Sequence, residues 1–273
     1  MTRAATEPGR LFGIGVGPGD PDLMSVKAAR LIAETSTVAY FAARHRPSIA
    51  RGVARHLLTD GHREIRIDYP LTVERAAPDD PLYEQLLVGC YDAAASRIEK
   101  ELAQGHDVAV LCEGDPFFYG SYMYVHNRLA GRFETTVVPG IPSLVAGAAA
   151  ISQPLACGNE VLSVLSGVLS LTELTAALVT CDAAVIIKLG RNLSKVRQAV
   201  AAADLLERAF YIERASSEQQ MCCPLAQADT SRAPYFSMVV IPSAAASRQS
   251  FPAPIRAINQ SIPSAGTTSS SGK

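Results

Sequence analysis

The sequence predicts an α/β protein in which strands alternate with helices and the sheets are largely parallel. Short apolar segments of strand length alternate with longer segments of helical periodicity. Several of the apolar segments end in turns rich in Gly and Pro. The alternation restarts after Pro142, which ends a Pro-Gly-Ile-Pro segment at 139–142, so two α/β domains are expected.

The first half of the chain is expected to form strands and helices in turn. The expected strands are 11–16, 37–41, 64–68, 107–112 and 135–138, and the expected helices are 24–34, 49–58, 82–104 and 120–129. The helix over 82–104 has the clearest pattern, because Asp80 and Pro81 mark its start and Gly105 follows its end. Its apolar residues repeat at i+4 steps: Leu82, Leu86, Cys90, Ala94, Ile98 and Leu102.

The second half continues the alternation. The expected helices are 144–151, 171–180 and 193–203, and the expected strands are 161–165, 183–188, 209–213 and 235–241. The last strand follows another strand without a helix between them, which predicts some antiparallel pairing in this half.

The two ends of the chain differ in composition from the middle. Residues 1–9 are expected to be a flexible polar leader, and 244–273, rich in Ser, Ala, Pro and Gly, a disordered tail. Between them we expect an N-terminal α/β domain over 10–140 and a C-terminal α/β domain over 141–243.

Composition and charge exclude several classes of protein. Of the 273 residues, 48% are hydrophobic and 19% charged, which is enough to bury a core. The net charge of -1 argues against a general nucleic-acid binder, which needs a basic surplus. The longest apolar run, Leu144–Ile151, is shorter than the ~20 residues of a membrane span, and Met1–Arg10 lacks a signal peptide's apolar segment. We therefore expect a cytoplasmic protein without membrane contact.

Cysteine and histidine spacing argues against a metal site. The six cysteines contain no CxxC pair, so they are expected to be reduced thiols rather than a disulfide or zinc framework. The five histidines show neither HxH nor HExxH spacing. No metal is expected.

Glycine-rich motifs follow several expected strands, where open α/β sheets bind ligands. The first motif, Gly13 to Pro21, does not match the spacing of the dinucleotide fingerprint. Pro18 also lacks the amide hydrogen that a phosphate loop uses. The motif is either a tight turn or a rigid loop whose backbone approaches a ligand.

Two further motifs have the same two interpretations. Glu113 to Gly120 follows the strand 107–112, and in it Gly114 allows close backbone approach while Asp115 accepts hydrogen bonds from hydroxyls. The alternative is an Asp-Pro turn that opens a helix. Val138 to Ser143 is either a linker or a helix start whose free amides face the same ligand.

Cationic side chains near other strand ends also leave two interpretations. Lys188 either extends along apolar surface to reach water or binds an anion. Arg214 either pairs with Glu213 at the surface or contributes to a site. Arg44 and Arg46 form either part of a solvated face or a site for carboxylates.

The order of these motifs resembles the tetrapyrrole (corrin and porphyrin) methyltransferase family. GxGPGDP, GDPFFYGS, VPGIPS and a strand that ends in KLGRN follow one another over roughly residues 10–243. Four segments are similar to the precorrin-2 C(20)-methyltransferase branch of that family: Asp68–Thr72, Cys112–Ser121, Ile187–Asn192 and Tyr211–Ser216.

The resemblance implies S-adenosyl-L-methionine in a cleft between two α/β domains, and a homodimer. Cofactor contacts are implied for Pro18, for Glu113, Gly114, Asp115 and Phe118 at the ribose and methionine parts, and for Pro142, Ser143, Leu189 and Ala215 on the adenine side. Some relatives that methylate uroporphyrinogen carry a proposed aspartate base where this chain has Phe41, which argues against that activity here.

The implied reaction is methyl transfer to C(20) of precorrin-2, which gives precorrin-3A in cobalamin biosynthesis. The electron-rich carbon attacks the sulfonium methyl directly, so alignment at ~3–3.5 Å in a dry cleft is sufficient without a metal. No catalytic base is assigned. Residues expected to bind the eight-carboxylate macrocycle or assist proton loss are Arg44, Arg46, Tyr119, Tyr122, Tyr124, His126, Lys188, Arg191 and Arg214.

Three alternatives stay open. The substrate is the cobalt-bound factor II of the anaerobic route, or the methyl acceptor is another carbon of a tetrapyrrole, or the chain is a non-enzymatic module that binds a tetrapyrrole or a nucleotide. Binding of S-adenosyl-L-methionine separates the enzymes from the module. Replacing Asp115 by alanine is expected to weaken that binding with little loss of fold, since a loop carboxylate contributes little to a core.

Overall fold

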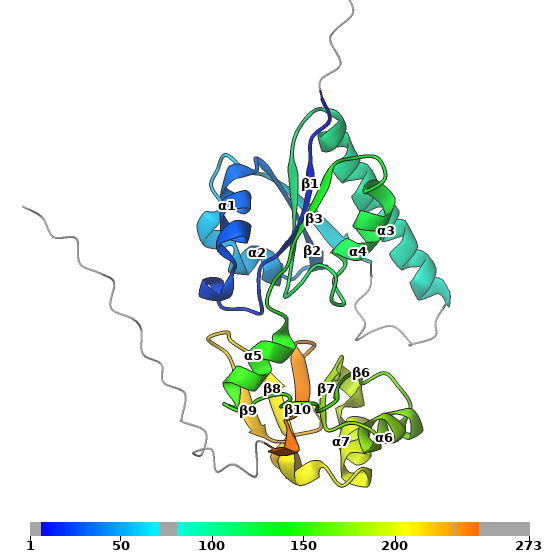
Figure 1. The fold of residues 1–273 in the computed structure, drawn as a ribbon. Coiled ribbons are helices and arrows are strands. Elements are labelled where there is room, and N and C mark those ends of the chain that lie inside the picture. The colour runs from blue at the N-terminus through cyan, green and yellow to red at the C-terminus, as the bar shows by residue number, and fades with distance from the viewer. Residues whose placement is uncertain (1–6, 71–80, 232, 246–273) are drawn as a thin grey trace, which may run out of the picture.

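Two five-stranded sheets, each covered by its own helices, form two lobes that are joined just before α5 (Ser143–Ala150) (Figure 1). This computed structural model describes residues 7–70, 81–231 and 233–245. The predicted α/β class is confirmed. Most of the expected leader and tail lies outside the described residues, as do residues 71–72 of one motif.

Among the described residues we looked for membrane-spanning helices, metal-ligating clusters and paired cysteines. None of their helices combines the length and the apolar composition that a bilayer crossing requires. No group of three or more metal-ligating side chains lies together among them. All six cysteines are free, with Cys112 buried and Cys222 exposed.

The first sheet is parallel throughout, with the strand order β3-β2-β4-β1-β5. Its strands are β1 (Leu11–Gly15), β2 (Thr37–Ala43), β3 (Arg63–Tyr69), β4 (Val108–Cys112) and β5 (Thr135–Val138), and its helices are α1 (Val26–Glu34), α2 (Ile49–Val53), α3 (Pro81–Ala103) and α4 (Tyr122–Leu129). α1 begins two residues later than expected because Ser25 is its N-cap and accepts a hydrogen bond from Ala28 N at 3.1 Å. The helix expected at 49–58 is α2 followed by a short 3₁₀ turn, Arg55–Leu57.

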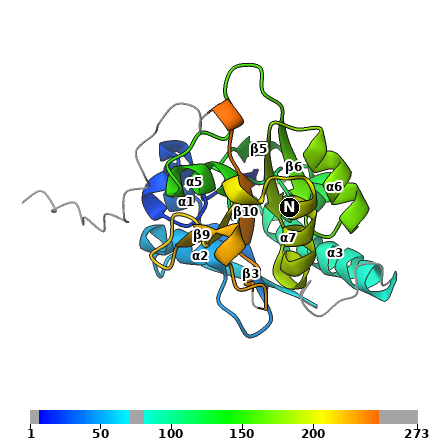
Figure 2. The same ribbon diagram turned by 90° about the horizontal axis from the view of Figure 1, so that it is seen from below.

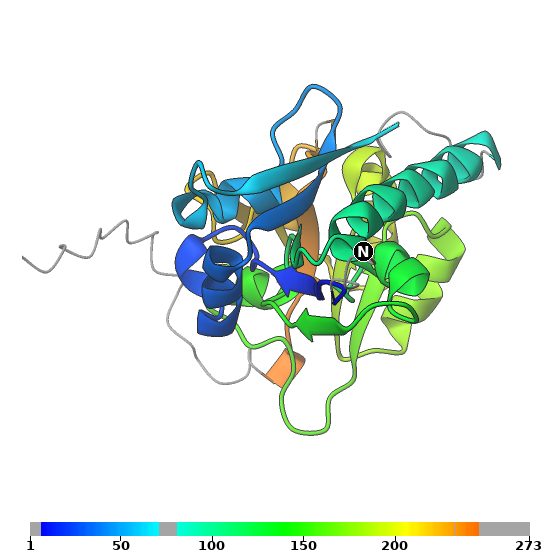
Figure 3. The same cartoon turned by 90° about the horizontal axis from the view of Figure 1, so that it is seen from above.

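Helices cover both faces of this sheet. α1 and α2 pack on one face around residues such as Ile14 and Ile32, and α3 and α4 pack on the other around Val110 and Ile98 (Figures 1 and 3). The chain runs from β1 to one side of the sheet and from β4 to the other side, so the strand order reverses between these two neighbours. Open α/β sheets bind ligands at such a point, beyond the carboxyl ends of the strands.

The apolar row expected along α3 is buried only in its C-terminal half. Ile98 and Leu102 are fully buried, whereas Leu86 is 38% exposed. The side chain of Leu82 lies outside the described residues. With about 3.6 residues per turn, each i+4 step advances about 40° around the helix axis, so a long i+4 row winds away from the sheet.

The second sheet is mixed, with the order β6-β7-β10-β8-β9. Its strands are β6 (Leu162–Ser166), β7 (Ala183–Ile187), β8 (Phe210–Glu213), β9 (Met221–Pro224) and β10 (Ser237–Ile241). Only β6 and β7 pair in parallel; the antiparallel pairing expected for the last strand is confirmed by its bonds to β7 and β8. β9 was not expected. α5 covers one face, and α6 (Leu171–Val179) and α7 (Leu193–Ala202) cover the other (Figure 2).

Glycines let the ends of neighbouring strands in the first sheet touch backbone to backbone. A Cβ atom on Gly15 would lie 2.5 Å from Gly140 N and 2.6 Å from Gly114 O. A Cβ on Gly140 would collide with Gly114 O and with the Gly15 backbone. Side chains do not fit such spaces, so these glycines determine how closely the loops after β1, β4 and β5 approach one another.

Replacing Gly140 by alanine should lower the free energy of unfolding by about 2 kcal/mol or more, since the new Cβ has to displace backbone. Gly89→Ala is the matched control, because Gly89 lies in α3 and a Cβ added there would meet no atom within 4 Å. The control should raise stability by about 0.5–1 kcal/mol through helix propensity. Urea denaturation of both variants measures the difference, and equal effects would contradict a special role for Gly140.

Candidate ligand-binding cleft

The loops after β1 and β4 meet where the strand order reverses. Gly114 N donates to Gly17 O at 2.8 Å, and Gly17 N donates to Gly114 O at 3.4 Å. Their φ angles of 84° and 62° lie in the left-handed region that glycine adopts readily. Pro18 and Asp115, the next residues along the chain, are therefore on adjacent loops at the ligand-binding edge of the sheet.

The carboxylate of Asp115 joins the β4 loop to the segment after β5. Its Oδ2 accepts a hydrogen bond from Gly140 N at 3.0 Å, and its Oδ1 accepts one from Phe117 N at 2.9 Å. The first bond connects two strand-end loops, and the second closes the Asp-Pro turn. Asp115 therefore supports the fold of the cleft, contrary to the expectation from the sequence that its loss would affect the fold little.

Glu113 is reached by solvent, yet the surrounding protein desolvates its carboxyl. Burial raises the pKa of Glu113, and hydrogen bonds from its own amide and from Ala50 N oppose this shift in part. The Ala50 bond measures 3.2 Å to Oε1. A carboxyl that is accessible but desolvated is typical of a functional cleft.

The segment after β5 brings the amino end of α5 beside Gly114. The Cα of Pro142 and the amide nitrogen of Ser143 lie 3.5 and 4.0 Å from the position that a Cβ on Gly114 would take. Pro142 is the N-cap of α5 and makes no side-chain capping bond. The first amides of α5 therefore receive no hydrogen bond from the side chain of the N-cap residue.

The second lobe meets the Pro18 loop at Ala215 and Ser216. Asp20 N donates to Ser216 Oγ at 3.1 Å. Ala215 O would lie 3.4 Å from a Cβ on Gly19. The structure thus brings together Pro18 and Ala215, two residues from opposite ends of the chain that the family resemblance assigned to one site.

Tyr119 and Lys188 bring the β4 loop and the end of β7 together. Lys188 Nζ lies 4.7 Å from the centre of the Tyr119 ring. Both side chains line a cavity of about 330 Å³. The residues around this cavity are Phe117, Phe118, Tyr119, Met123, Tyr124 and Lys188. Phe118 also packs against the core of the second lobe, which fixes the β4 loop against that lobe.

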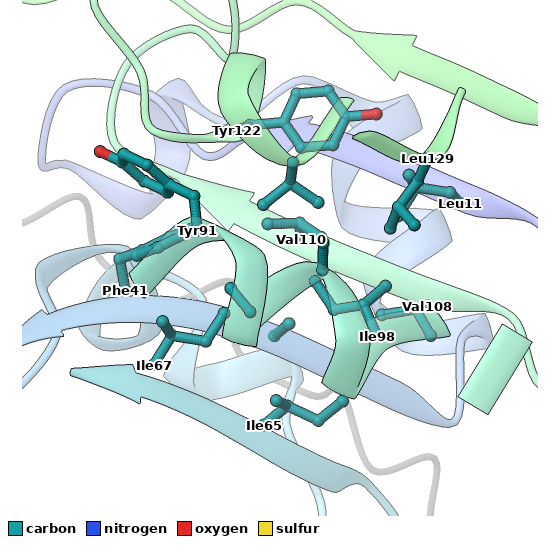
Figure 4. Close-up of a cluster of buried hydrophobic side chains, with 14 of the residues drawn as sticks. Leu11, Phe41, Ile65, Ile67, Tyr91, Ile98, Val108, Val110, Tyr122 and Leu129 are labelled. Carbon is teal, nitrogen blue, oxygen red and sulfur yellow. The ribbon is translucent and has the colours of Figure 1, made fainter. Parts of the chain in front are cut away.

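Two residues predicted for the site have their side chains in the cores instead. Tyr122 is fully buried in the first lobe, near Val110 and Leu129 (Figure 4), so it is not available to a macrocycle. Gly13 makes room for its ring, because a Cβ there would overlap the ring. Leu189 is fully buried in the core of the second lobe, just after β7.

Tyr124 and His126 lie on α4, close to the β4 loop. Tyr124 is 45% exposed and stacks on Tyr91 with 4.3 Å between ring centres. His126 meets the ring of Phe117 edge-on at 5.0 Å. Both therefore belong to an aromatic surface that continues from the cavity along α4.

The predicted arginines are distributed more widely. Arg44 and Arg46 follow β2, and Arg44 lines a separate cavity of about 270 Å³ beside α3. Arg191 lies in a 3₁₀ turn after β7. Arg214 is 3.8 Å from the carboxylate of Glu213, so the surface ion pair between these neighbours is present. The structure does not bring these four arginines to the cavity of Lys188.

A group of hydroxyls that the sequence did not assign to the site lies at the end of β3. Tyr69 and Ser121 hydrogen-bond through their side chains, and Tyr91 OH lies 3.4 Å from the same Ser121 oxygen. Burial raises the pKa of Tyr69 well above its ordinary value, and the negative charge of Glu113 contributes. Tyr69 thus keeps its proton. Its position at a strand end, within the motif that begins at Asp68, was the available signal.

Comparison with known proteins agrees with this arrangement. A family model of tetrapyrrole (corrin/porphyrin) methylases matches residues 10–229. The chain belongs to the tetrapyrrole methylase family. The match begins at the residue before β1 and continues beyond β9, so both lobes are part of the methylase unit.

Two methylase relatives are similar along most of the chain. The cobalamin biosynthesis protein CobIJ of Mycobacterium tuberculosis is 48% identical over 86% of this chain and 46% of its own length. The chain therefore spans about half the length of that relative. A precorrin-2 C(20)-methyltransferase of a Sinorhizobium species is 43% identical over 86% of this chain and 95% of its own length.

A solved structure shares the fold. The uroporphyrin-III C-methyl transferase from Thermus thermophilus, crystallised with S-adenyl homocysteine, aligns with a TM-score of 0.59. The alignment covers 86% of this chain and 92% of that chain, at 20% sequence identity. The two-lobed α/β architecture is therefore that of solved tetrapyrrole methylases.

Replacing Asp115 by alanine should lower the free energy of unfolding by about 1–3 kcal/mol even without ligand, because two backbone amides lose their acceptor. Asp60→Ala is the control, since Asp60 is exposed and has no partner among the described residues. That change should stay within about 0.5 kcal/mol. Urea denaturation decides; an Asp115 variant as stable as the control would show that the carboxylate does not hold the loops.

The raised pKa of Glu113 predicts a pH-dependent stability. The folded chain holds this proton more tightly than the unfolded chain, whose glutamate has a pKa of about 4.3. The free energy of unfolding should therefore fall as pH rises from about 4 through the raised pKa. Glu113→Gln keeps an acceptor for Ala50 N and should remove this loss. Denaturation at several pH values should find the variant equal to the wild type near pH 4 and more stable at neutral pH. A difference independent of pH would contradict the prediction.

Proposed function

We propose that the chain transfers a methyl group from S-adenosyl-L-methionine to C(20) of precorrin-2, giving precorrin-3A. The observation that carries this proposal is the convergence of the loops after β1, β4 and β5, with loops of the second lobe against them. The 43% identity with the Sinorhizobium precorrin-2 C(20)-methyltransferase, over 95% of that protein, supports the substrate and the carbon.

The converging loops fit S-adenosyl-L-methionine. Gly114, paired with the buried Gly17, brings half-buried backbone to the switch point, and the amino end of α5 at Ser143 offers amides to adenine nitrogens. Each oxygen of Asp115 keeps a second lone pair beyond its backbone bond, and Glu113 adds another acceptor for ribose hydroxyls. The bound cofactor supplies a methyl group on a positively charged sulfur, which needs no metal to activate it.

The residues of the chain would then orient the acceptor and exclude water. Phe117 and Tyr124 offer apolar ring surface beside the β4 loop, suited to a flat macrocycle. The hydroxyl of Tyr69 keeps its proton and hydrogen-bonds with Ser121 at the end of β3. Rate enhancement would come mainly from alignment of the acceptor carbon with the methyl group.

The test is turnover of metal-free precorrin-2 by the purified chain with carbon-13-labelled methyl donor. One labelled methyl should appear, and its NMR shift should place it on C(20). Turnover of the cobalt complex alone would assign the chain to the anaerobic reaction, and a methyl on another carbon would assign it to another tetrapyrrole methylase. Failure to bind S-adenosyl-L-methionine in calorimetry would favour a non-enzymatic binding module.

Several finer expectations stay predictions. We infer that two copies of the chain form a homodimer, as the family resemblance implied, and that the protein works in the cytoplasm, as the sequence pattern predicted. The boundaries at 10–140 and 141–243, the cofactor contacts and the macrocycle contacts also stay predictions. Their support is the placement of the named loops around one cleft.

A further inference from the structure

Lys188 is a cation between the two lobes that no carboxylate among the described residues pairs with. Its only described interaction is the contact of its ammonium group with the Tyr119 ring, at 4.7 Å. Six arginines of the first lobe differ from Lys188, since each lies within 4.0 Å of a carboxylate oxygen: Arg10, Arg51, Arg63, Arg66, Arg128 and Arg132. Lys188 thus has a charge available for a ligand.

The backbone holds Lys188 and Tyr119 in an uncommon conformation. Their φ angles are 58° and 56°, in the left-handed region that residues with a side chain rarely adopt. Such residues persist only where the surrounding structure determines them, and they cluster at functional sites. Here the two strained residues come from different lobes and face each other, so the ammonium group is positioned before a ligand arrives.

The surroundings of Lys188 favour an anion attached to a flat apolar body. Burial lowers the pKa of Lys188, with no opposing contribution from a nearby carboxylate. The other walls of the cavity are apolar or aromatic, with Phe117, Met123 and Tyr124 among them. A ligand carboxylate would restore the favourable environment of the charged lysine, while the rings would pack against the body that carries it.

We propose that Lys188 binds a peripheral carboxylate of the tetrapyrrole, and that Tyr119 holds the ammonium group in place for this contact. This inference rests on the proposed function and deepens it, because it assigns the orientation of the substrate to one cation. Lys188 is then a substrate-binding residue beside the methyl donor, because Leu189 next to it and Phe118 in the same cavity are both expected to contact that cofactor.

Lys188→Gln should raise the KM for precorrin-2 by about 10- to 100-fold, the range for losing one hydrogen bond to a charged group. The kcat should change less than about threefold, and the affinity for S-adenosylhomocysteine less than about twofold. Lys188→Arg should restore much of the KM. Lys100→Gln is the matched control, since Lys100 is exposed near the C-terminal end of α3, which leads into the amino end of β4 and not into the loop at its carboxyl end.

Tyr119→Leu provides a second test that leaves the lysine in place. The single variant Tyr119→Leu should raise the KM for precorrin-2 by a smaller factor than Lys188→Gln does. The double variant should have a KM no more than about twofold above that of Lys188→Gln, because the ring acts through the lysine. Independent, multiplying effects would overturn the role of Tyr119.

The outcomes separate this inference from the proposed function. If the wild type methylates precorrin-2 and Lys188→Gln keeps its KM, the carboxylate contact is wrong and the function stands. If Lys188→Gln loses S-adenosylhomocysteine affinity as strongly as substrate affinity, Lys188 belongs to the donor side and the inference is wrong. If the wild type does not methylate precorrin-2 at all, the proposed function itself fails. Thermal melting of each variant confirms that it is folded.

Discussion

Backbone contact between strand ends is the constraint on which the cleft depends. Gly15 ends β1, Gly114 and Gly140 follow β4 and β5 of the same parallel sheet, and no side chain fits at Gly15 or Gly140. Their contact draws the loops after β1, β4 and β5 into one place, at the reversal of strand order. The pattern of small residues there reflects the approach of main chain to main chain and not only the geometry of single turns.

The two lobes hold the cleft through a few contacts of different kinds. Asp20 and Ser216 contribute a hydrogen bond, Tyr119 and Lys188 a cation–π contact, and Phe118 an apolar contact with the second core. Strained backbone also borders this region, because Lys188 and Ser216 both have positive φ. Conformations of this kind need support from both lobes, which ties the local geometry of the site to the way the lobes dock.

Sequence patterns predicted the fold because buried parallel strands and amphipathic helices leave local signatures. They also predicted which loops meet, since ligand loops of α/β sheets follow strand ends. They did not predict which way a side chain points: Tyr122 stands at the start of a helix beside the cleft, and only its packing over Gly13 shows that it faces the core.

Contacts between residues distant in sequence could not be predicted from the sequence either. The acceptor role of Asp115 depends on Gly140, 25 residues away. Leu86 is partly exposed because an i+4 row winds around its helix. β9 was not predicted because its four residues, Met-Cys-Cys-Pro, show no alternation of apolar and polar side chains. In each case the missing information is the three-dimensional neighbour and not the local preference.

The position of Phe118 resists separation of the two lobes. The same short loop carries a carboxylate bonded within the first lobe at Asp115 and a ring inserted against the core of the second at Phe118. Swinging the lobes apart would pull that ring into water, which is unfavourable for an aromatic side chain. The hydrogen bond of Asp115 and the packing of Phe118 therefore both oppose opening of the cleft by separation of the lobes.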